Sequence, residues 1–82
     1  MTRIEAVIDF LKKEFPDGIQ MFSTRNVIGD YLYPIYEKDD VSIEYCSNWY
    51  YVEIFGLTRD EWDILTQCGE WDNSLDIMKK WY

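Results

Sequence analysis

Histidine is absent from this sequence, and only two of its 82 residues are cysteine. Without histidine the chain has neither a Ser-His-Asp nor a Cys-His catalytic arrangement, and every zinc motif that uses histidine is excluded. Cys46 and Cys68 are too few for an all-cysteine zinc site or for the disulfide framework of a small secreted domain. We therefore expect two reduced thiols, no catalytic residue, no metal and no cofactor.

Long hydrophobic runs are also missing. No segment approaches the roughly 18 apolar residues of a membrane-spanning helix. Residues 1–15 carry charges throughout, unlike the apolar core of a signal peptide. Neither the P-loop nor the G-x-G-x-x-G pattern of nucleotide-binding proteins occurs. These absences predict a cytoplasmic protein that makes no membrane contact.

Basic residues are scarce relative to acidic ones. Eight Lys and Arg stand against sixteen Asp and Glu, which gives a formal net charge of −8. That charge disfavours direct contact with nucleic acid or with an anionic membrane, since both attract basic patches. It favours a partner protein with a basic surface. The chain is nevertheless 48% hydrophobic and 18% aromatic, which is enough for the dense core of one folded domain over residues 1–82.

A helix is predicted at the N-terminus. Thr2 and Glu5 have the spacing of a capping box, and apolar residues recur after them at helical spacing. This apolar stripe consists of Ile4, Val7, Ile8, Leu11 and Phe15. Pro16 and Gly18 are expected to end the helix, because proline lacks the backbone donor and glycine tolerates a left-handed turn.

The sequence pattern of residues 19–55 predicts several strands. Ile19 to Phe22 fits a short edge strand, and Tyr31 to Glu37 fits a strand that Pro34 confines to an edge or a bulge. Val41 to Cys46 and Trp49 to Phe55 alternate with period two. An antiparallel meander of three strands follows from this pattern. Its turns are residues 38–40 and 47–48.

Two further helices are predicted in the C-terminal third. Thr58 and Glu61 repeat the capping-box spacing, and Gly69 fits the residue that follows the end of that helix. A short terminal helix is expected to begin at Asp72 or Asn73. The inward residues of the two helices would be Trp62, Leu65, Trp71, Leu75, Met78 and Trp81. The predicted fold class is therefore α+β, a single small domain of order α-β-β-β-α-α, with helices packed on one face of a three-stranded antiparallel meander.

One sheet face would then be left uncovered. Alternation directs Val41, Ile43 and Val52 toward the helices, so their neighbours point outward. A contiguous patch of exposed rings marks a contact surface, and Tyr and Trp are enriched in interface hot spots. We predict that this acidic, aromatic face binds a basic partner protein without catalysing a reaction. The predicted partner-binding residues are Trp49, Tyr51, Glu53, Phe55, Glu44 and Tyr33.

Other interpretations of these residues stay open. All the rings could belong to the core, since a small domain needs its rings for burial, or the face could form a homodimer. The acids could mimic nucleic-acid phosphates and block a host protein that binds DNA or RNA. A small enzyme with paired carboxylates is a second alternative. The one-three-five spacing of Asp72, Ser74 and Asp76 fits a Ca²⁺ loop only in part, because the glycine and the final glutamate of an EF-hand are missing.

Three motifs between residues 23 and 62 carry a family resemblance. They are RN followed by GD, IYEKDD, and YVEIFGLT before an acidic helix. This half of the chain resembles an uncharacterised family of small acidic proteins from Gram-positive bacteria and their phages. The resemblance implies a small accessory protein that binds and blocks a host machine, such as a restriction or CRISPR nuclease. It implies no active site.

Overall fold

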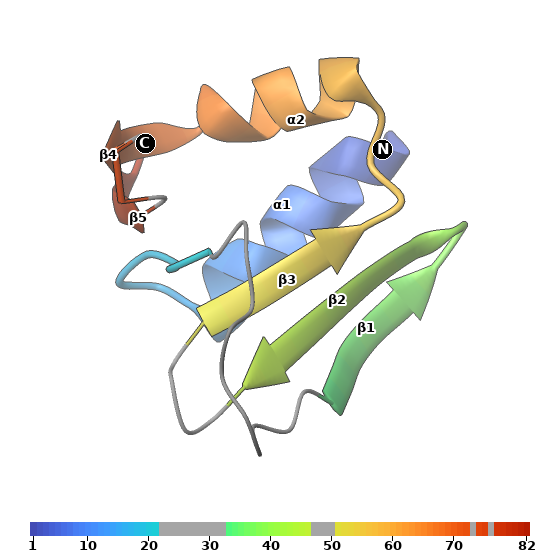
Figure 1. The fold of residues 1–82 in the computed structure, drawn as a ribbon. Helices are drawn as coiled ribbons and strands as arrows, with labels where there is room; N and C mark the ends of the chain where they lie inside the picture. The colour runs from blue at the N-terminus through green and yellow to red at the C-terminus, as the bar shows by residue number, and fades with distance from the viewer. Residues whose placement is uncertain (22–32, 47–50, 73, 76) are drawn as a thin grey trace.

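The structure is a computed structural model, and it describes residues 1–21, 33–46, 51–72, 74–75 and 77–82. The elements in this part of the chain are α1 (Arg3–Glu14), β1 (Tyr33–Lys38), β2 (Val41–Cys46), β3 (Tyr51–Phe55), α2 (Arg59–Thr66), β4 (Gly69–Asp72) and β5 (Ile77–Trp81) (Figure 1). The first three strands form an antiparallel sheet of order β1-β2-β3, and β4 pairs with β5. The predicted α+β class with a three-stranded antiparallel sheet is confirmed.

α1 begins and packs as its sequence pattern predicts. The Thr2 hydroxyl accepts a hydrogen bond from the Glu5 N–H at 3.3 Å, and the same hydroxyl donates to Glu5 Oε1 at 2.9 Å. Thr2 is therefore the N-cap, although Glu5 does not complete the reciprocal capping box. The buried residues of the helix are Ile4, Val7, Ile8 and Leu11.

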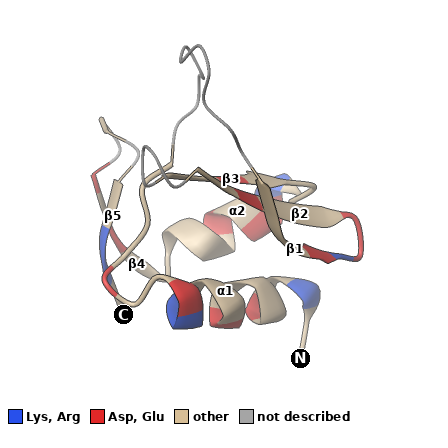
Figure 2. Cartoon of the chain, turned by 90° about the horizontal axis from the view of Figure 1, so that it is seen from below, with Lys and Arg blue, Asp and Glu red and all other residues tan. Residues whose placement is uncertain are grey.

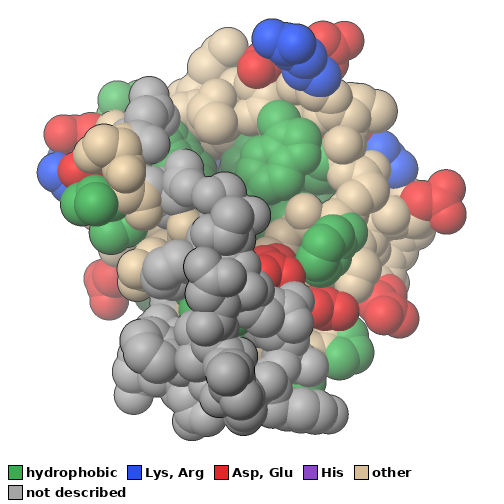
Figure 3. All heavy atoms as spheres, in the orientation of Figure 1, with side chains coloured by type: hydrophobic (Ala, Val, Ile, Leu, Met, Phe, Trp, Pro, Cys, Tyr) green, Lys and Arg blue, Asp and Glu red, His purple; other side chains and the backbone are tan. Residues whose placement is uncertain are grey.

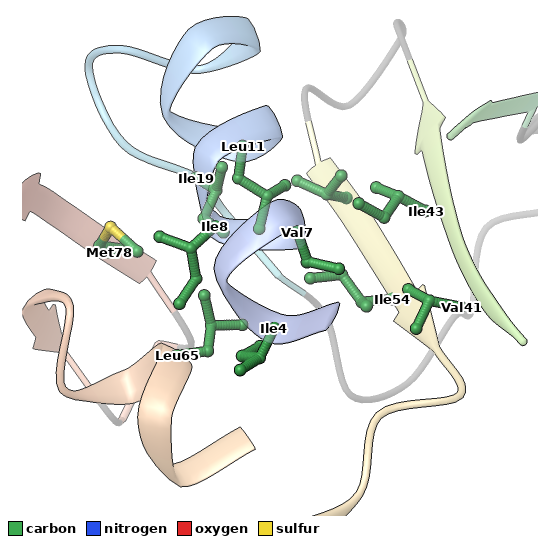
Figure 4. Close-up of a cluster of buried hydrophobic side chains, with 11 residues drawn as sticks. Ile4, Val7, Ile8, Leu11, Ile19, Val41, Ile43, Ile54, Leu65 and Met78 are labelled. Carbon is green, nitrogen blue, oxygen red and sulfur yellow. The ribbon is translucent and has the colours of Figure 1, made fainter. Parts of the chain in front are cut away.

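The main core lies between α1 and the three-stranded sheet. The sheet forms one layer and α1 another, as the view from below shows (Figure 2). Side chains from α1 meet those of β2 and β3, with Leu65 of α2 and Met78 of β5 at one side (Figure 4). The inward residues of the sheet are Val41, Ile43, Val52 and Ile54, all of them buried. The inward assignment made from their alternation is confirmed.

The β1-β2 hairpin has the shortest common turn. Lys38 pairs with Val41, so Asp39 and Asp40 alone make the turn, and their φ angles are 51° and 67°. Two positive φ angles define the type I′ geometry, whose twist matches that of the flanking strands. β1 is an edge strand, and its register shifts between Pro34 and Tyr36. The edge position and the bulge predicted from the proline are both present.

α2 has the complete capping box that its sequence predicts. The Thr58 hydroxyl accepts from the Glu61 N–H at 3.2 Å, and Glu61 Oε1 accepts from the Thr58 N–H at 2.9 Å. The prediction for Gly69 is wrong, because the helix is capped by Gln67 and Gly69 begins β4. A Cβ atom at this glycine would lie 2.5 Å from the carbonyl oxygen of Lys80, so close pairing with β5 requires the residue.

The predicted terminal helix is wrong, because residues 69–72 and 77–81 form the paired strands β4 and β5. Asp72 does bond a nearby N–H, as a helix cap would, but the contact closes a turn. Its Oδ1 accepts from the Ser74 hydroxyl at 2.6 Å and from the Ser74 N–H at 3.1 Å. The Leu75 N–H donates to the Asp72 carbonyl oxygen at 3.1 Å. The bonds from Ser74 are the main cause that lowers the pKa of Asp72, and Lys79 contributes.

Residues 19–21 join the two sheets. The Gln20 carbonyl oxygen accepts from the Val52 N–H of β3, and the Ile19 carbonyl oxygen accepts from the Met78 N–H of β5, both at 2.8 Å. Successive carbonyls of an extended chain point to opposite sides, so this segment lies between β3 and β5. The predicted edge position of Ile19 to Phe22 is therefore wrong for residues 19–21. Phe22 lies outside the described residues.

Arg3, a residue of α1, connects one end of the three-stranded sheet to α2. Its Nη1 donates to the Asp39 carbonyl oxygen at 2.6 Å, and its Nη2 donates to the Gly56 carbonyl oxygen at 3.1 Å. Its Nε donates to Glu61 Oε2 at 3.0 Å, and Nη2 forms an ion pair with Glu61 Oε1. We call this set of contacts the Arg3 clamp. The hydrogen bonds that Arg3 donates to Glu61 are the main cause that lowers the pKa of Glu61 from 4.5 to about 2. The hydrogen bond from the Thr58 N–H is the second cause.

Gly56 is required where the clamp meets the chain. Its φ angle is +89°, and a Cβ atom there would lie 1.8 Å from the Asp40 carbonyl oxygen. Only glycine combines this backbone conformation with such close packing. The β1-β2 turn and the exit from β3 are therefore held together by backbone packing as well as by Arg3.

Replacement of Leu65 by alanine tests the shared core. Leu65 is fully buried in the cluster beneath α1, so we expect Leu65→Ala to lower the free energy of unfolding by about 2–5 kcal/mol. The neighbouring Ile64 is 43% exposed, and Ile64→Ala should cost less than about 1 kcal/mol. Urea unfolding of the two variants and the wild type measures both values. Equal losses would show that α2 does not share the core.

The Arg3 clamp predicts a pH dependence of stability. Because the pKa of Glu61 is depressed in the folded chain, its contribution is complete above about pH 4.5 and is lost as the pH falls toward 2. The free energy of unfolding should therefore fall less steeply in Glu61→Gln than in the wild type over this range. Urea unfolding at a series of pH values measures the slope. Asp63→Asn, which removes an exposed carboxylate from the same helix but no contact of the Arg3 clamp, is the matched control.

Candidate functional site

Most described rings of the sheet face α1. Tyr36 packs on Phe10 with ring centroids 4.7 Å apart, and Tyr45 packs on Phe15 at 5.6 Å. Tyr33 meets the edge of the Tyr45 ring at 5.8 Å. Tyr33 therefore lies on the helix side, and its predicted place on the outer face is wrong. The bulge after Pro34 explains this, because one extra residue puts both Tyr33 and Tyr36 on the same side of the sheet.

The strand register fixes which residues share the outer face of the β1-β2-β3 sheet, the side away from α1. Residues paired across neighbouring strands point to the same side. One row contains Glu37, Ser42 and Phe55, the next contains Pro34, Glu44 and Glu53, and the last contains Cys46 and Tyr51. We call Glu37, Ser42, Glu44, Glu53 and Phe55 the acidic sheet face. Figure 3 views the molecule from this side and shows acidic side chains beside hydrophobic ones.

One predicted ring position of β3 does not supply an accessible ring. Tyr51 points to the outer side of the sheet, but it is only 2% exposed, and its strand partner Cys46 is fully buried. The expectation of an exposed Tyr51 is therefore wrong. Trp49 lies outside the described residues. Phe55 is the predicted ring that the structure leaves accessible, with 49% of its surface exposed.

The predicted acids are brought together. Glu44 and Glu53 are direct cross-strand partners in β2 and β3. Like charges in this position repel each other, and both side chains are half-buried, which strengthens the repulsion. Glu53 already takes part in an interaction within the chain. Within the described residues, Glu44 has no ion-pair partner.

Sequence analysis missed Glu37. This residue is exposed near the end of β1 and is the strand partner of Ser42, which in turn pairs with Phe55. Its side chain therefore joins the acidic sheet face. The signal that could have found it is the two-residue turn of Asp39 and Asp40, which pairs Glu37 with the outward Ser42. Only the register places Glu37 on the outer side.

The described residues offer no site for a metal. No group of at least three His, Cys, Asp or Glu side chains among them is placed to hold an ion. Of the residues whose spacing fits a Ca²⁺ loop in part, Asp72 bonds Ser74, and Asp76 lies outside the described residues. In the same part of the chain, no helix has the length and apolar character needed to cross a membrane.

Comparisons with protein-family models, curated proteins and solved structures gave no match. The resemblance of residues 23–62 to small phage and bacterial proteins therefore stays a prediction. The acidic sheet face must be interpreted from its own geometry and charge.

Two rings of β3 provide a direct test of this geometry. Tyr51 is buried and Phe55 is half-exposed, although both point to the outer side of the sheet. We expect Tyr51→Ala to lower the free energy of unfolding by about 3–5 kcal/mol, as for other buried rings. Phe55→Ala should cost less than about 1 kcal/mol. Thermal and urea unfolding measure both variants, and a larger loss for Phe55→Ala would contradict the described burial.

Proposed function

We propose that this chain is a non-enzymatic protein-interaction module that binds a basic partner protein through the acidic sheet face. The observation that carries the proposal is the half-exposed ring of Phe55 in one row with Glu37 and beside Glu44. A contact surface combines an apolar centre with a polar rim, and Phe55 with the acids around it has this arrangement. The ring would supply buried area, and the acids would supply specificity and electrostatic steering.

Among the described residues, no basic side chain lies on the acidic sheet face. No outward residue of β1, β2 or β3 is Lys or Arg, and neither Glu37 nor Glu44 forms an ion pair with a described residue. Several basic side chains are engaged elsewhere. Lys13 pairs with Asp9 at 3.1 Å, and Lys12 lies 5.9 Å from the ring centre of Trp81. Since the described residues supply no positive charge to Glu37 and Glu44, we propose that a basic partner supplies it.

The same charge disfavours the homodimer. A two-fold interface places the same patch of each copy against the other, so the carboxylates around Phe55 would approach their own copies.

The role of a nucleic-acid mimic is favoured less than the binding of an ordinary basic protein, because the exposed acids are spread over several elements. Those outside the acidic sheet face include Glu5, Asp9, Glu14, Asp39, Asp40, Asp60, Asp63 and Glu70.

Capture of a partner from a lysate of the source cells, followed by purification of that partner, tests the proposal. The test variant combines Glu37→Gln, Glu44→Gln and Phe55→Ala. We expect it to bind the purified partner at least about tenfold more weakly than the wild type, a loss of about 1.4 kcal/mol. The wild type should also lose affinity between about 0.1 M and 1 M salt, because the partner is basic.

A matched control separates the contribution of the acidic sheet face to the affinity from the contribution of the net charge. Glu14→Gln, Asp63→Asn and Ile64→Ala together remove the same charge and one half-exposed apolar side chain from the two helices. This control should retain the wild-type affinity. The proposal is wrong if the test variant binds as tightly as the control, since the helices or another surface would then hold the partner.

A further inference from the structure

We infer that the acidic sheet face recognises arginine side chains, presented by an extended segment of the partner with arginine at alternate positions. This inference rests on the proposed function and goes beyond it by stating the chemistry of the bound group. It follows from three features of the face: one accessible ring, carboxylates on two sides of a short residue, and rows that repeat along the strands.

The accessible ring is the first feature. Phe55 is 49% exposed and lies next to Ser42 across the sheet. A cation placed over the face of an aromatic ring is attracted by the ring quadrupole, and arginine occupies such positions more often than lysine. The planar guanidinium also stacks on a ring while its donors point sideways. Phe55 therefore offers a platform that favours a flat cation.

The carboxylates are the second feature. Ser42 has the shortest side chain of the acidic sheet face, and it lies between Phe55 on β3 and Glu37 on β1. Glu44 lies two residues further along β2, on the same side. Neighbouring strands are about 4.8 Å apart, so a group above Ser42 is close to the ring and to both carboxylates. A guanidinium has five N–H donors in a fixed fork, which can serve more than one carboxylate, whereas the lysine ammonium is a compact charge that holds water strongly.

The repeat of the rows is the third feature. The row of Phe55 and the row of Glu44 and Glu53 are two residues apart along β2 and β3. Alternate side chains of any extended segment are spaced by about 6.5–7 Å and point to the same side. A partner segment that follows the strands would therefore place successive arginines over successive rows. A single exposed ion pair contributes little, so the two positions together provide the selectivity.

Titration with defined peptides tests this inference. The probes are acetylated, amidated Gly-Arg-Ser-Arg-Gly and two matched peptides in which lysine or neutral citrulline replaces both arginines. The observable is the set of backbone amide resonances of the isotope-labelled full chain. The arginine peptide should shift the resonances of residues 37, 42, 44 and 55, the lysine peptide should bind at least about threefold more weakly, and the citrulline peptide should produce no shift.

One substitution separates the contribution of the ring to arginine binding from that of the acids. Phe55→Leu keeps an apolar side chain but removes the quadrupole, so the arginine peptide should lose about two- to fivefold in affinity while the lysine peptide changes less. Ile64→Ala on α2 is the control and should leave both affinities unchanged. The unperturbed resonances of the remaining residues show whether each variant is folded.

The outcomes distinguish this inference from the proposed function. Equal affinities for the arginine and lysine peptides would overturn arginine recognition and leave a basic partner in place. Shifts confined to residues outside the acidic sheet face, or no shift with the arginine peptide at millimolar concentration, would also overturn it. The proposed function fails by a different result, namely an undiminished affinity of the captured partner for the variant that lacks Glu37, Glu44 and Phe55.

Discussion

The Arg3 clamp is the interaction on which the rest of the structure depends. A single guanidinium in the first turn of α1 reaches the Asp39 and Gly56 carbonyls and the Glu61 carboxylate, so it fixes the β1-β2 turn, the exit of β3 and the start of α2 together. Phe55 directly precedes Gly56 in the chain. The residue that holds the helices against the sheet thus also fixes the backbone beside the accessible ring. The proposed contact surface and the Arg3 clamp therefore lie at the same end of the sheet.

Much of the fold could be predicted because its signals are local. The alternation of β2 and β3 gives the inward residues directly, since the period of a strand decides which side each residue faces. The capping box of Thr58 and Glu61 gives the start of α2, and Pro34 gives an edge strand with a bulge. In each case the residues that carry the signal are also the residues that make the contact.

The remainder depends on contacts that lie far apart in the sequence. An aspartate that accepts the N–H of the second residue after it starts a helix or closes a turn equally well, so Asp72 alone could not exclude the β4-β5 hairpin. The bulge reverses the alternation of β1, so Tyr33 lies on the helix side although Glu37, four residues later, lies on the acidic sheet face. Alternation gave the correct side for Tyr51 but no information on its burial. Side and exposure are separate properties in a domain this small.

The position of residues 19–21 between β3 and β5 has a consequence for synthesis. This early segment receives one hydrogen bond from Val52 and another from Met78, close to the other end of the chain. A ribosome therefore releases α1 and its apolar stripe long before the strand that completes the core beside them exists. The nascent chain must keep that stripe exposed, or held by a chaperone, until β5 emerges. The core is therefore expected to form in a single event once β5 is available, rather than stepwise as each element is synthesised.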